Sequence, residues 1–593
     1  MPFDYYSLPY CRPATVKVDS ENVGEALAGD RNENSDYKLL MKENKECEVL
    51  CTVQLKKEDQ SAFVRAIDDE YRVHWIVDNL PVAVRSESSD AQEVFERGFP
   101  VGFHTGKKGK DVTLNRHYIN NHVRIIIQYH DDDAPMDAST QSANEITAKI
   151  IGFRAESRSI KHSAVGATSG KTLGSCAKQN QEESSYQSVD TVGDTVVFTY
   201  DVIWEATDTP WSNRWDAYLS ADVSNDKVHW FSITNSIMVV LFLTVMIAMI
   251  LIRALRKDIA QYNDPASLEE AKEETGWKLV HGDVFRPPST SPMLLSVFVG
   301  TGVQLFWMCL CTLAFSVAGL LSPANRGSIV TGFILLFVFM GSLAGYYSST
   351  TYKMFRGLAW KENTFYTAFL FPGAVFLIMG TINAVLWVEG SSGALPFSSF
   401  FTLLFLWFCV SVPLVFLGSF YGYKREVDTF PVRTNQIPRQ VPAAPWYTSP
   451  AITCMVAGVL PFAAVSVELY FIMSALWLHH IYYIFGFLFL VMLVLIVTCA
   501  EISILLCYVQ LCNEDYHWWW RSFFTSGSCS VYMMLYAVWY NMTELNLEGF
   551  VPIMIYFGYM SILSLSFFLL TGTVGFFSCY WFNIKIYNSI KVD

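Results

Sequence analysis

The C-terminal part of the chain lacks charged residues. Of the 593 residues, the first 230 contain 25 Lys and Arg and 37 Asp and Glu, whereas the remaining 363 contain only 17 and 18. So little charge excludes an ordinary water-exposed surface for this part and is typical of chain that lies in hydrocarbon. The first 230 residues carry a net charge of −12, so they lack the basic surplus that binding to nucleic acid requires.

Complete enzyme motifs are also missing. Residues 166–172, GATSGKT, are one residue short of a phosphate-binding loop and lie outside a strand-to-helix context. Residues 130–133, HDDD, offer carboxylates that suit calcium, but no further spaced ligands follow, so we interpret them as a solvated turn. No Ser-His-Asp or Cys-His arrangement occurs at a nucleophile turn. We therefore expect no enzymatic activity, no cofactor and no metal site.

Residues 231–593 contain long apolar runs. A bilayer core requires about 20 apolar residues per helix, and nine runs after His229 reach or approach this length. The sequence therefore predicts an α-helical polytopic membrane protein with nine transmembrane helices. The runs are 233–255, 294–321, 329–350, 364–388, 400–423, 450–476, 481–511, 523–541 and 551–582.

The positive charges between these runs predict the orientation. Sixteen Lys and Arg border the connections after the odd-numbered helices and the C-terminus, whereas the opposite connections hold only Arg326. The positive-inside rule places the richer side in the cytosol. We thus expect a lumenal domain at 1–230, a membrane domain at 231–583 and a cytosolic tail at 584–593. Because the chain begins without an apolar signal segment, we expect a signal peptide and upstream residues to be missing.

Four of the thirteen cysteines lie in the acidic N-terminal domain. An even number on an oxidising side of the membrane predicts two disulfides, with four free buried thiols as the alternative. The four allow three pairings, among which we favour Cys11 with Cys51. These residues are Cys11, Cys47, Cys51 and Cys176.

The N-terminal domain has the pattern of a β-rich fold. Alternating β-branched and aromatic residues between polar loops predict strands, and their spacing suggests a β-sandwich. One short helix is expected at 60–71, capped by Asp59. The expected strands are 47–55, 72–77, 122–130, 145–155 and 195–204.

A few polar residues interrupt the apolar runs. Glu468 and Glu501 lie in the sixth and seventh runs, and Asn383 lies in the fourth. Because burying charge in lipid is costly, such residues are candidate intramembrane sites. The functional interpretation is a proton or ion relay. The structural interpretation, which we prefer, is a pair of carboxyls hydrogen-bonded to neighbouring helices.

Two GxxxG patterns indicate close approach between helices. Gly341 and Gly345 lie in the third run, and Gly418 and Gly422 lie in the fifth. Glycine at this spacing lets helix backbones meet in a membrane. We expect these glycines to pack inside the bundle, with a docking face for client helices as the alternative.

Five segments in order resemble the nonaspanins, also called the endomembrane protein 70 or transmembrane-nine superfamily. The resemblance implies a large lumenal domain, nine helices and work in the Golgi and endosomes, in sorting and surface delivery of membrane proteins. It implies no enzymatic mechanism. The segments are YYSLPYC at 5–11, GWKLVHGDVFRP at 276–287, SPANRG at 322–327, PVRTNQIPRQ at 431–440 and EDYHW at 514–518.

The C-terminus resembles the family's Lys-x-Asp/Glu signal for the COPI coat. Lys591 and the terminal Asp593 would form a compact ionic code for a charged pocket on the coat. A rival clathrin-adaptor signal begins at Tyr587, but this residue lies too near the last helix for an adaptor to reach, so we favour the coat. The proline-rich segment around 433–440 is expected to form an ordered cytosolic loop.

These observations predict a Golgi and endosome membrane protein that sorts and localises other transmembrane proteins. The expected partners are transmembrane cargo proteins, the COPI coat and the lipid bilayer. The alternative is a proton- or ion-coupled transporter or channel that uses Glu468 and Glu501.

Overall fold

The membrane helices dominate the structure. It is a computed structural model that describes the chain apart from residues 1, 20–21, 30, 88–92, 106–115, 132–147, 164–167, 177–184, 192, 216–222, 263–275, 322–326, 428, 443–445, 447–448, 478–484, 548 and 590–593. Within the described residues, eight helices are long and apolar enough to cross a membrane, which confirms the predicted polytopic architecture. They are α4 (Val223–Tyr262), α5 (Pro292–Val317), α6 (Ser328–Met354), α7 (Trp360–Val388), the joined α8 and α9 (Phe397–Phe405 and Val412–Lys424), α10 (Pro450–Trp477), α11 (Phe485–Cys512) and α14 (Phe550–Asn588).

The run predicted at 523–541 is divided into two shorter helices. These are α12 (Trp518–Gly527) and α13 (Cys529–Tyr540), which meet at Ser528. The Ser528 hydroxyl donates to the carbonyl oxygens of Cys454 on α10 and of Thr525 one turn earlier. Hydroxyls that bond to backbone carbonyls in this way bend helices. A similar break between α8 and α9 is a π-helical turn, which ends beside Pro413, a residue with no N–H for an α-helical bond.

A six-stranded sheet forms the core of the N-terminal region. The order is β3-β14-β12-β13-β7-β8, with β12 parallel to β14, β13 parallel to β7 and the other neighbours antiparallel. The predicted β-rich domain is confirmed. The bounds are β3 (Lys45–Gln54), β7 (Ala83–Glu87), β8 (Glu93–Arg97), β12 (His122–Asp131), β13 (Ala148–Arg158) and β14 (Thr195–Ala206).

A β-sandwich would cover this sheet with a second large sheet. Here a helix and short strands cover it instead. Phe63 and Ile67 of α2 (Lys57–Asp68) pack with residues of the short strands against the sheet. Asp59 lies in the third position of α2, where its carboxylate accepts from the Lys56 backbone N–H, so it is not the N-cap residue. The expected strand at 72–77 is likewise two short strands. The short pairs are β1 (Val18–Asp19) with β2 (Asn32–Glu33), β4 (Arg72–Val73) with β9 (Phe99–Pro100), β5 (Ile76–Val77) with β6 (Leu80–Pro81), and β10 (Gly102–Thr105) with β11 (Arg116–Ile119).

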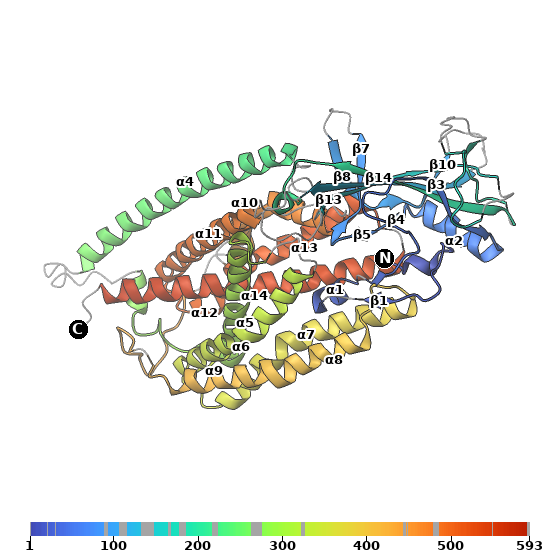
Figure 1. Cartoon of the computed structure of the whole chain (residues 1–593). Coiled ribbons are helices and arrows are strands. Elements are labelled where there is room, and N and C mark those ends of the chain that lie inside the picture. The colour runs from blue at the N-terminus through green and yellow to red at the C-terminus, as the bar shows by residue number, and fades with distance from the viewer. Residues whose placement is uncertain are drawn as a thin grey trace, which may run out of the picture.

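The β-rich domain rests on one end of the helix bundle. Its helix α1 (Val23–Ala28) meets the start of α6, where the Gly24 backbone N–H donates to the Thr331 hydroxyl. The Pro2 carbonyl accepts from Ser391 and Ser392 in the connection between α7 and α8. Figure 1 shows α14 running along the bundle, away from the end on which the β-rich domain lies. The connections that meet the β-rich domain are those predicted to be lumenal.

Candidate functional site

Three of the five sequence motifs come together at the other end of the bundle. We call the segments 276–290, 430–440 and 513–521, with the end of α14, the loop assembly. The Asn435 backbone N–H donates to the Gly282 carbonyl at 2.8 Å, and a side chain at Gly282 would collide with Asn435. The segments share one hydrophobic core that includes Val284, Val432 and Trp518. Spacing along the sequence gives no sign of this meeting, because the motifs lie far apart in the chain.

A buried carboxylate holds two of these segments. Asp283 is 2% exposed and accepts from Arg286 Nε at 2.9 Å and from the Arg439 backbone N–H at 3.3 Å. The Arg286 guanidinium also donates to the Asn435 carbonyl at 2.7 Å. Arg439 Nη2 lies 2.9 Å from Glu514 Oε2, which ties in the third segment. These bonds agree with the expectation of an ordered loop at 433–440.

Three consecutive tryptophans fix the segment before α5. The indole N–H groups of Trp518, Trp519 and Trp520 donate to the carbonyls of Val284, Arg286 and Thr290 at 2.9, 2.8 and 2.8 Å, respectively. Each indole thus satisfies a carbonyl outside regular secondary structure while its ring fills apolar space. The EDYHW segment at 514–518 includes only the first of the three.

The end of α14 is anchored in the same assembly. Tyr587 is 1% exposed and donates to the Trp277 carbonyl at 2.8 Å. Trp277 in turn donates to Asp258 near the end of α4 at 3.1 Å. The side chain of Tyr587 is therefore not accessible to a clathrin adaptor. Lys591 and Asp593 lie outside the described residues.

The intramembrane polar residues Glu501 and Asn383 have separate hydrogen-bond partners. Glu501 of α11 accepts a hydrogen bond from the Thr244 hydroxyl of α4, and its bonding partner is not Glu468. Glu468 is 2% exposed in α10. Asn383 accepts from the Leu395 backbone N–H at 2.7 Å and so stabilises the connection between α7 and α8. His479 and His480, which the sequence places beside these spans, lie outside the described residues.

The two GxxxG patterns face each other inside the bundle. A side chain at Gly345 would collide with the Val415 carbonyl, and one at Gly418 would collide with the Ser342 carbonyl. Gly422 similarly approaches the Tyr346 backbone, and Gly341 lies against Val415. This places α6 against α9, so these glycine faces are occupied within the chain.

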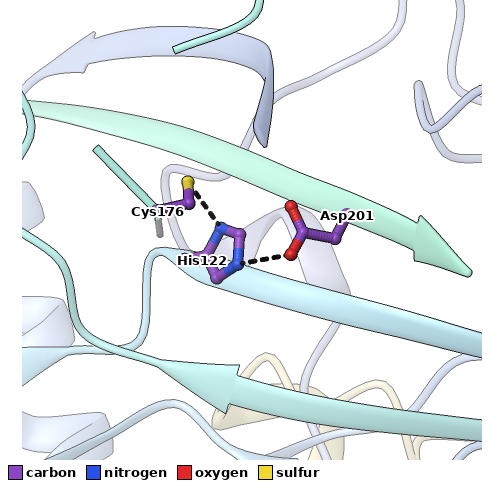
Figure 2. Close-up of side chains that lie close together, drawn as sticks. All are labelled: His122, Cys176 and Asp201. Atoms are coloured by element: carbon purple, nitrogen blue, oxygen red, sulfur yellow. Dashed lines mark hydrogen bonds and ion pairs between the residues drawn. The ribbon is translucent and has the colours of Figure 1, made fainter. Parts of the chain in front are cut away.

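Two disulfides cross-link the β-rich domain. They join Cys11 to Cys51 and Cys47 to Cys176. Figure 2 shows Cys176 beside His122, whose other ring nitrogen faces Asp201. The Sγ atom lies 3.5 Å from Nδ1 of His122, and Nε2 of the same ring lies 3.4 Å from the Asp201 carboxylate.

This cluster has three groups of the kinds that bind metal, within 4.8 Å of one another. The Cys176 sulfur belongs to a disulfide, however, so it is not a thiolate ligand. The two nitrogens of His122 also face different partners. In the oxidised chain the cluster therefore acts as a hydrogen-bond network around the disulfide.

The electrostatics of the β-rich domain follow from burial and hydrogen bonding. Burial of Asp201 opposes ionisation, but hydrogen bonds from His122 and the Cys47 backbone N–H outweigh it and hold the carboxyl pKa at about 2. Burial, followed by the charge of His122, lowers the pKa of His162 to about 4. His117 differs because the carboxylates of Asp190 and Asp68 outweigh its burial and raise its pKa.

The comparisons with known proteins identify the family. The family model "Endomembrane protein 70" matches residues 2–550. The chain belongs to the transmembrane 9 superfamily. Relatives include transmembrane 9 superfamily member 10 of Arabidopsis thaliana, which is 48% identical over all of this chain and 92% of its own length. Members 4 and 2 of Homo sapiens are 43% and 42% identical over all of this chain and over 92% and 89% of their own lengths. No solved structure matches the chain.

For a transmembrane 9 superfamily protein, the loop assembly is the best candidate site. Segments 276–287, 431–440 and 514–518, which carry much of the resemblance, all contribute to it. Of the other two, 5–11 lies in the β-rich domain, where Cys11 is cross-linked, and 322–327 ends at Gly327 against α1. Residues 322–326 lie outside the described residues.

Proposed function

We propose that this endomembrane protein sorts other transmembrane proteins in the Golgi and endosomes, without enzymatic activity. The observation that carries the proposal is the division of the molecule into two ordered ends joined by α14 (Figure 1). A sorting protein must bind its cargo on one side of the membrane and a coat on the other. The β-rich domain supplies a surface at one end, and the loop assembly with the C-terminal tail supplies one at the other.

The proposed orientation places the β-rich domain in the lumen and the loop assembly in the cytosol. Sixteen basic residues support this orientation. They border the C-terminus and the connections on the same side of the bundle as the loop assembly. The β-rich domain also holds both disulfides, which suits an oxidising lumen.

Cargo recognition requires the β-rich domain to keep its position on the helices. A Gly24→Val variant places a side chain against the Gly327 carbonyl and the Thr331 hydroxyl, whereas the control Gly174→Ala has open space around it. Proximity labelling in cells should show fewer transmembrane clients for Gly24→Val and the same clients for Gly174→Ala. Unchanged labelling by a folded Gly24→Val protein would argue against cargo binding that depends on this interface.

We propose that Lys591 and Asp593 form the signal for the COPI coat. The buried Tyr587 supports this choice, because an adaptor signal needs an accessible tyrosine. Changing Lys591 and Asp593 together to alanine should move the full-length protein from the Golgi to later compartments. Tyr587→Phe keeps the buried ring and should leave the location unchanged. A Golgi pattern that survives the double change rules out this signal.

Ion-coupled transport is the alternative function. Glu501 is the residue that favours it, because its carboxyl lies on one membrane-spanning helix, α11, and bonds to Thr244 on another, α4. Proteoliposomes that contain the full chain should show no pH-driven flux if sorting is the function. A flux that Glu501→Gln abolishes would support transport instead.

A further inference from the structure

The two disulfides of the β-rich domain have different surroundings. In each bridge one cysteine is buried and the other is partly exposed: Cys47 is 4% exposed, whereas Cys176 is more accessible. The bridge between Cys11 and Cys51 packs in the hydrophobic core of the domain. Cys176 instead lies beside the ring of His122. The two bridges therefore have similar burial but differ in the chemistry around the sulfur atoms.

The sheet brings His122 to Cys176. β12 and β14 are parallel neighbours in which His122 lies opposite Thr199, and Asp201 follows two residues later on the same face of β14. Nδ1 of His122 lies 3.5 Å from Sγ of Cys176, and Nε2 lies 3.4 Å from the Asp201 carboxylate (Figure 2). The Thr199 hydroxyl, 3.9 Å from the same sulfur, is a second donor to a thiolate. A sulfur, an imidazole and a carboxylate in this order form the arrangement that activates a cysteine thiol.

Hydrogen bonds hold the Asp201 carboxylate in place behind the ring. It accepts from the Cys47 backbone N–H at 2.7 Å and from Arg124 Nε at 3.3 Å. The carboxylate orients His122 and balances the charge that the ring gains when it takes a thiol proton. The same carboxylate thus contacts both the base and the backbone of the buried cysteine.

The backbone of Cys47 favours opening of the bridge. Its φ is +47°, in the left-handed region that residues with a Cβ atom rarely adopt. The register of β3 against β14 shifts at this point, between the partners Tyr200 and Val202. The disulfide and the bond to Asp201 hold Cys47 in this conformation, and reduction removes the first of these constraints. A bridge that holds a strained backbone is more readily reduced than an unstrained one.

We propose that Cys176 is a thiol–disulfide exchange site, with Cys47 as its resolving cysteine and His122 as its base. The substrate is a dithiol or a disulfide of another protein on the same side of the membrane as the β-rich domain. An accessible attacking cysteine and a buried resolving one suit this exchange, because a partner protein reaches only the first sulfur. The inference does not depend on the proposed sorting function.

The exchange begins with a dithiol as the reductant. One of its thiolates attacks Sγ of Cys176, the bond to Cys47 breaks, and Cys47 leaves as a thiolate that takes up one of the two protons of the dithiol. The second thiolate of the dithiol attacks its own sulfur in the mixed disulfide and releases Cys176 as a thiolate. His122 takes the other proton and pairs with this thiolate. The dithiol is thereby oxidised to a disulfide by two electrons, and the bridge is reduced; the reverse sequence reduces a substrate disulfide.

The test equilibrates the purified full chain, in detergent, with mixtures of reduced and oxidised dithiothreitol. Alkylation and mass spectrometry of the peptides then measure the state of each bridge. The Cys47–Cys176 bridge should be half reduced at a ratio of reduced to oxidised dithiothreitol about tenfold lower than the Cys11–Cys51 bridge, which corresponds to about 30 mV.

The variant His122→Asn should bring this ratio close to that of the other bridge, because the reduced form loses its base. The matched control His130→Asn changes a histidine of the same strand, whose Nδ1 lies 2.9 Å from the Thr207 carbonyl, and should leave both ratios unchanged. Because His122 is buried, an unchanged Cys11–Cys51 ratio shows that the variant is folded. Asp201→Asn keeps the size of the side chain and should shift the ratio in the same direction.

Single-cysteine variants identify the attacking sulfur. In Cys47→Ser, oxidised glutathione should form a mixed disulfide with Cys176: the thiolate attacks one glutathione sulfur, and the other glutathione leaves as a thiolate. In Cys176→Ser, the buried Cys47 should form this adduct about tenfold more slowly. Equal ratios for the two bridges, a ratio unaffected by both His122→Asn and Asp201→Asn, or equal adduct formation at the two cysteines would overturn the proposal.

Discussion

The two ends of the molecule order irregular chain by different chemistry. In the β-rich domain, disulfides join Cys11 to Cys51 and Cys47 to Cys176. In the loop assembly, indole and guanidinium groups donate to carbonyls and to the buried Asp283. The nine cysteines of the membrane part are free thiols. Covalent cross-links therefore order the β-rich domain, whereas hydrogen bonds and ring packing order the loop assembly.

The largest expected effect comes from breaking a disulfide. The bridges close sequence separations of 40 and 129 residues. The chain-entropy estimate gives about 4 kcal/mol for the shorter loop and about 5 for the longer one. Replacing Cys47 and Cys176 with serine should therefore lower the melting temperature of the β-rich domain more than replacing Cys11 and Cys51.

Thermal proteolysis of the full chain measures this effect, with Cys311→Ser as the control for a free cysteine. Equal melting temperatures for both double variants and the parent chain would contradict the expected contribution. Four alkylatable thiols in the unreduced N-terminal domain would also contradict the prediction, because they would show that neither disulfide is formed.

The second effect is a loss of stability in acid. His162 has a pKa of about 4 in the folded domain and an ordinary value of 6.5 when unfolded. The unfolded chain therefore binds more protons between these values, and stability falls as the pH decreases through this window. The loss approaches about 3 kcal/mol at the lower end.

The variant His162→Asn should flatten this pH dependence without removing the disulfide beside it. Thermal proteolysis across the window checks the slope. Asp201 titrates near pH 2 and so affects a separate, more acidic range. An unchanged slope in the variant would assign the acid sensitivity to other groups.

The third effect tests the loop assembly. Trp518→Phe keeps an aromatic ring but removes the N–H that bonds to the Val284 carbonyl. Leaving that buried carbonyl unpaired should cost about 1 to 3 kcal/mol. The melting temperature of the full chain in detergent should fall, whereas Trp446→Phe, at a residue that is 78% exposed, should change it little. Equal melting temperatures for the two variants would show that the indole bond contributes little.

Periodicity and composition predicted much of the fold but little of the candidate site. Apolar runs locate membrane helices because lipid requires them, and the even cysteine count indicated disulfides. The division at Ser528 was not predictable, because it depends on a hydroxyl bond to a different helix. The covering layer of the sheet also escaped prediction, since its short strands hold too few residues for a periodic signal.

The loop assembly could not be predicted for a related reason. Its segments meet through hydrogen bonds between residues that lie far apart in the chain. The acceptors of Trp519 and Trp520, for example, lie more than 200 residues away, so spacing along the sequence gives no sign of them.

The smallest expected effect concerns His117, a second histidine of the β-rich domain, whose effect on stability changes with pH in the opposite direction to that of His162. His117 lies 3.0 Å from both Asp68 and Asp190, and its pKa is raised because these carboxylates outweigh its burial. Its contribution is therefore complete below the unfolded pKa and is lost as the pH rises through the folded pKa. Because Asp68 is about half exposed, solvent screening limits the gain to less than about 1 kcal/mol. His117→Gln should lower the melting temperature slightly at about pH 5.5 and leave it unchanged well above the folded pKa. This dependence is opposite to that of His162. In acid the contacts of His117 with Asp68 and Asp190 therefore strengthen, while the surroundings of the Cys47–Cys176 disulfide weaken. If His117→Gln lowers the melting temperature equally at both pH values, the ring acts through packing and not through charge.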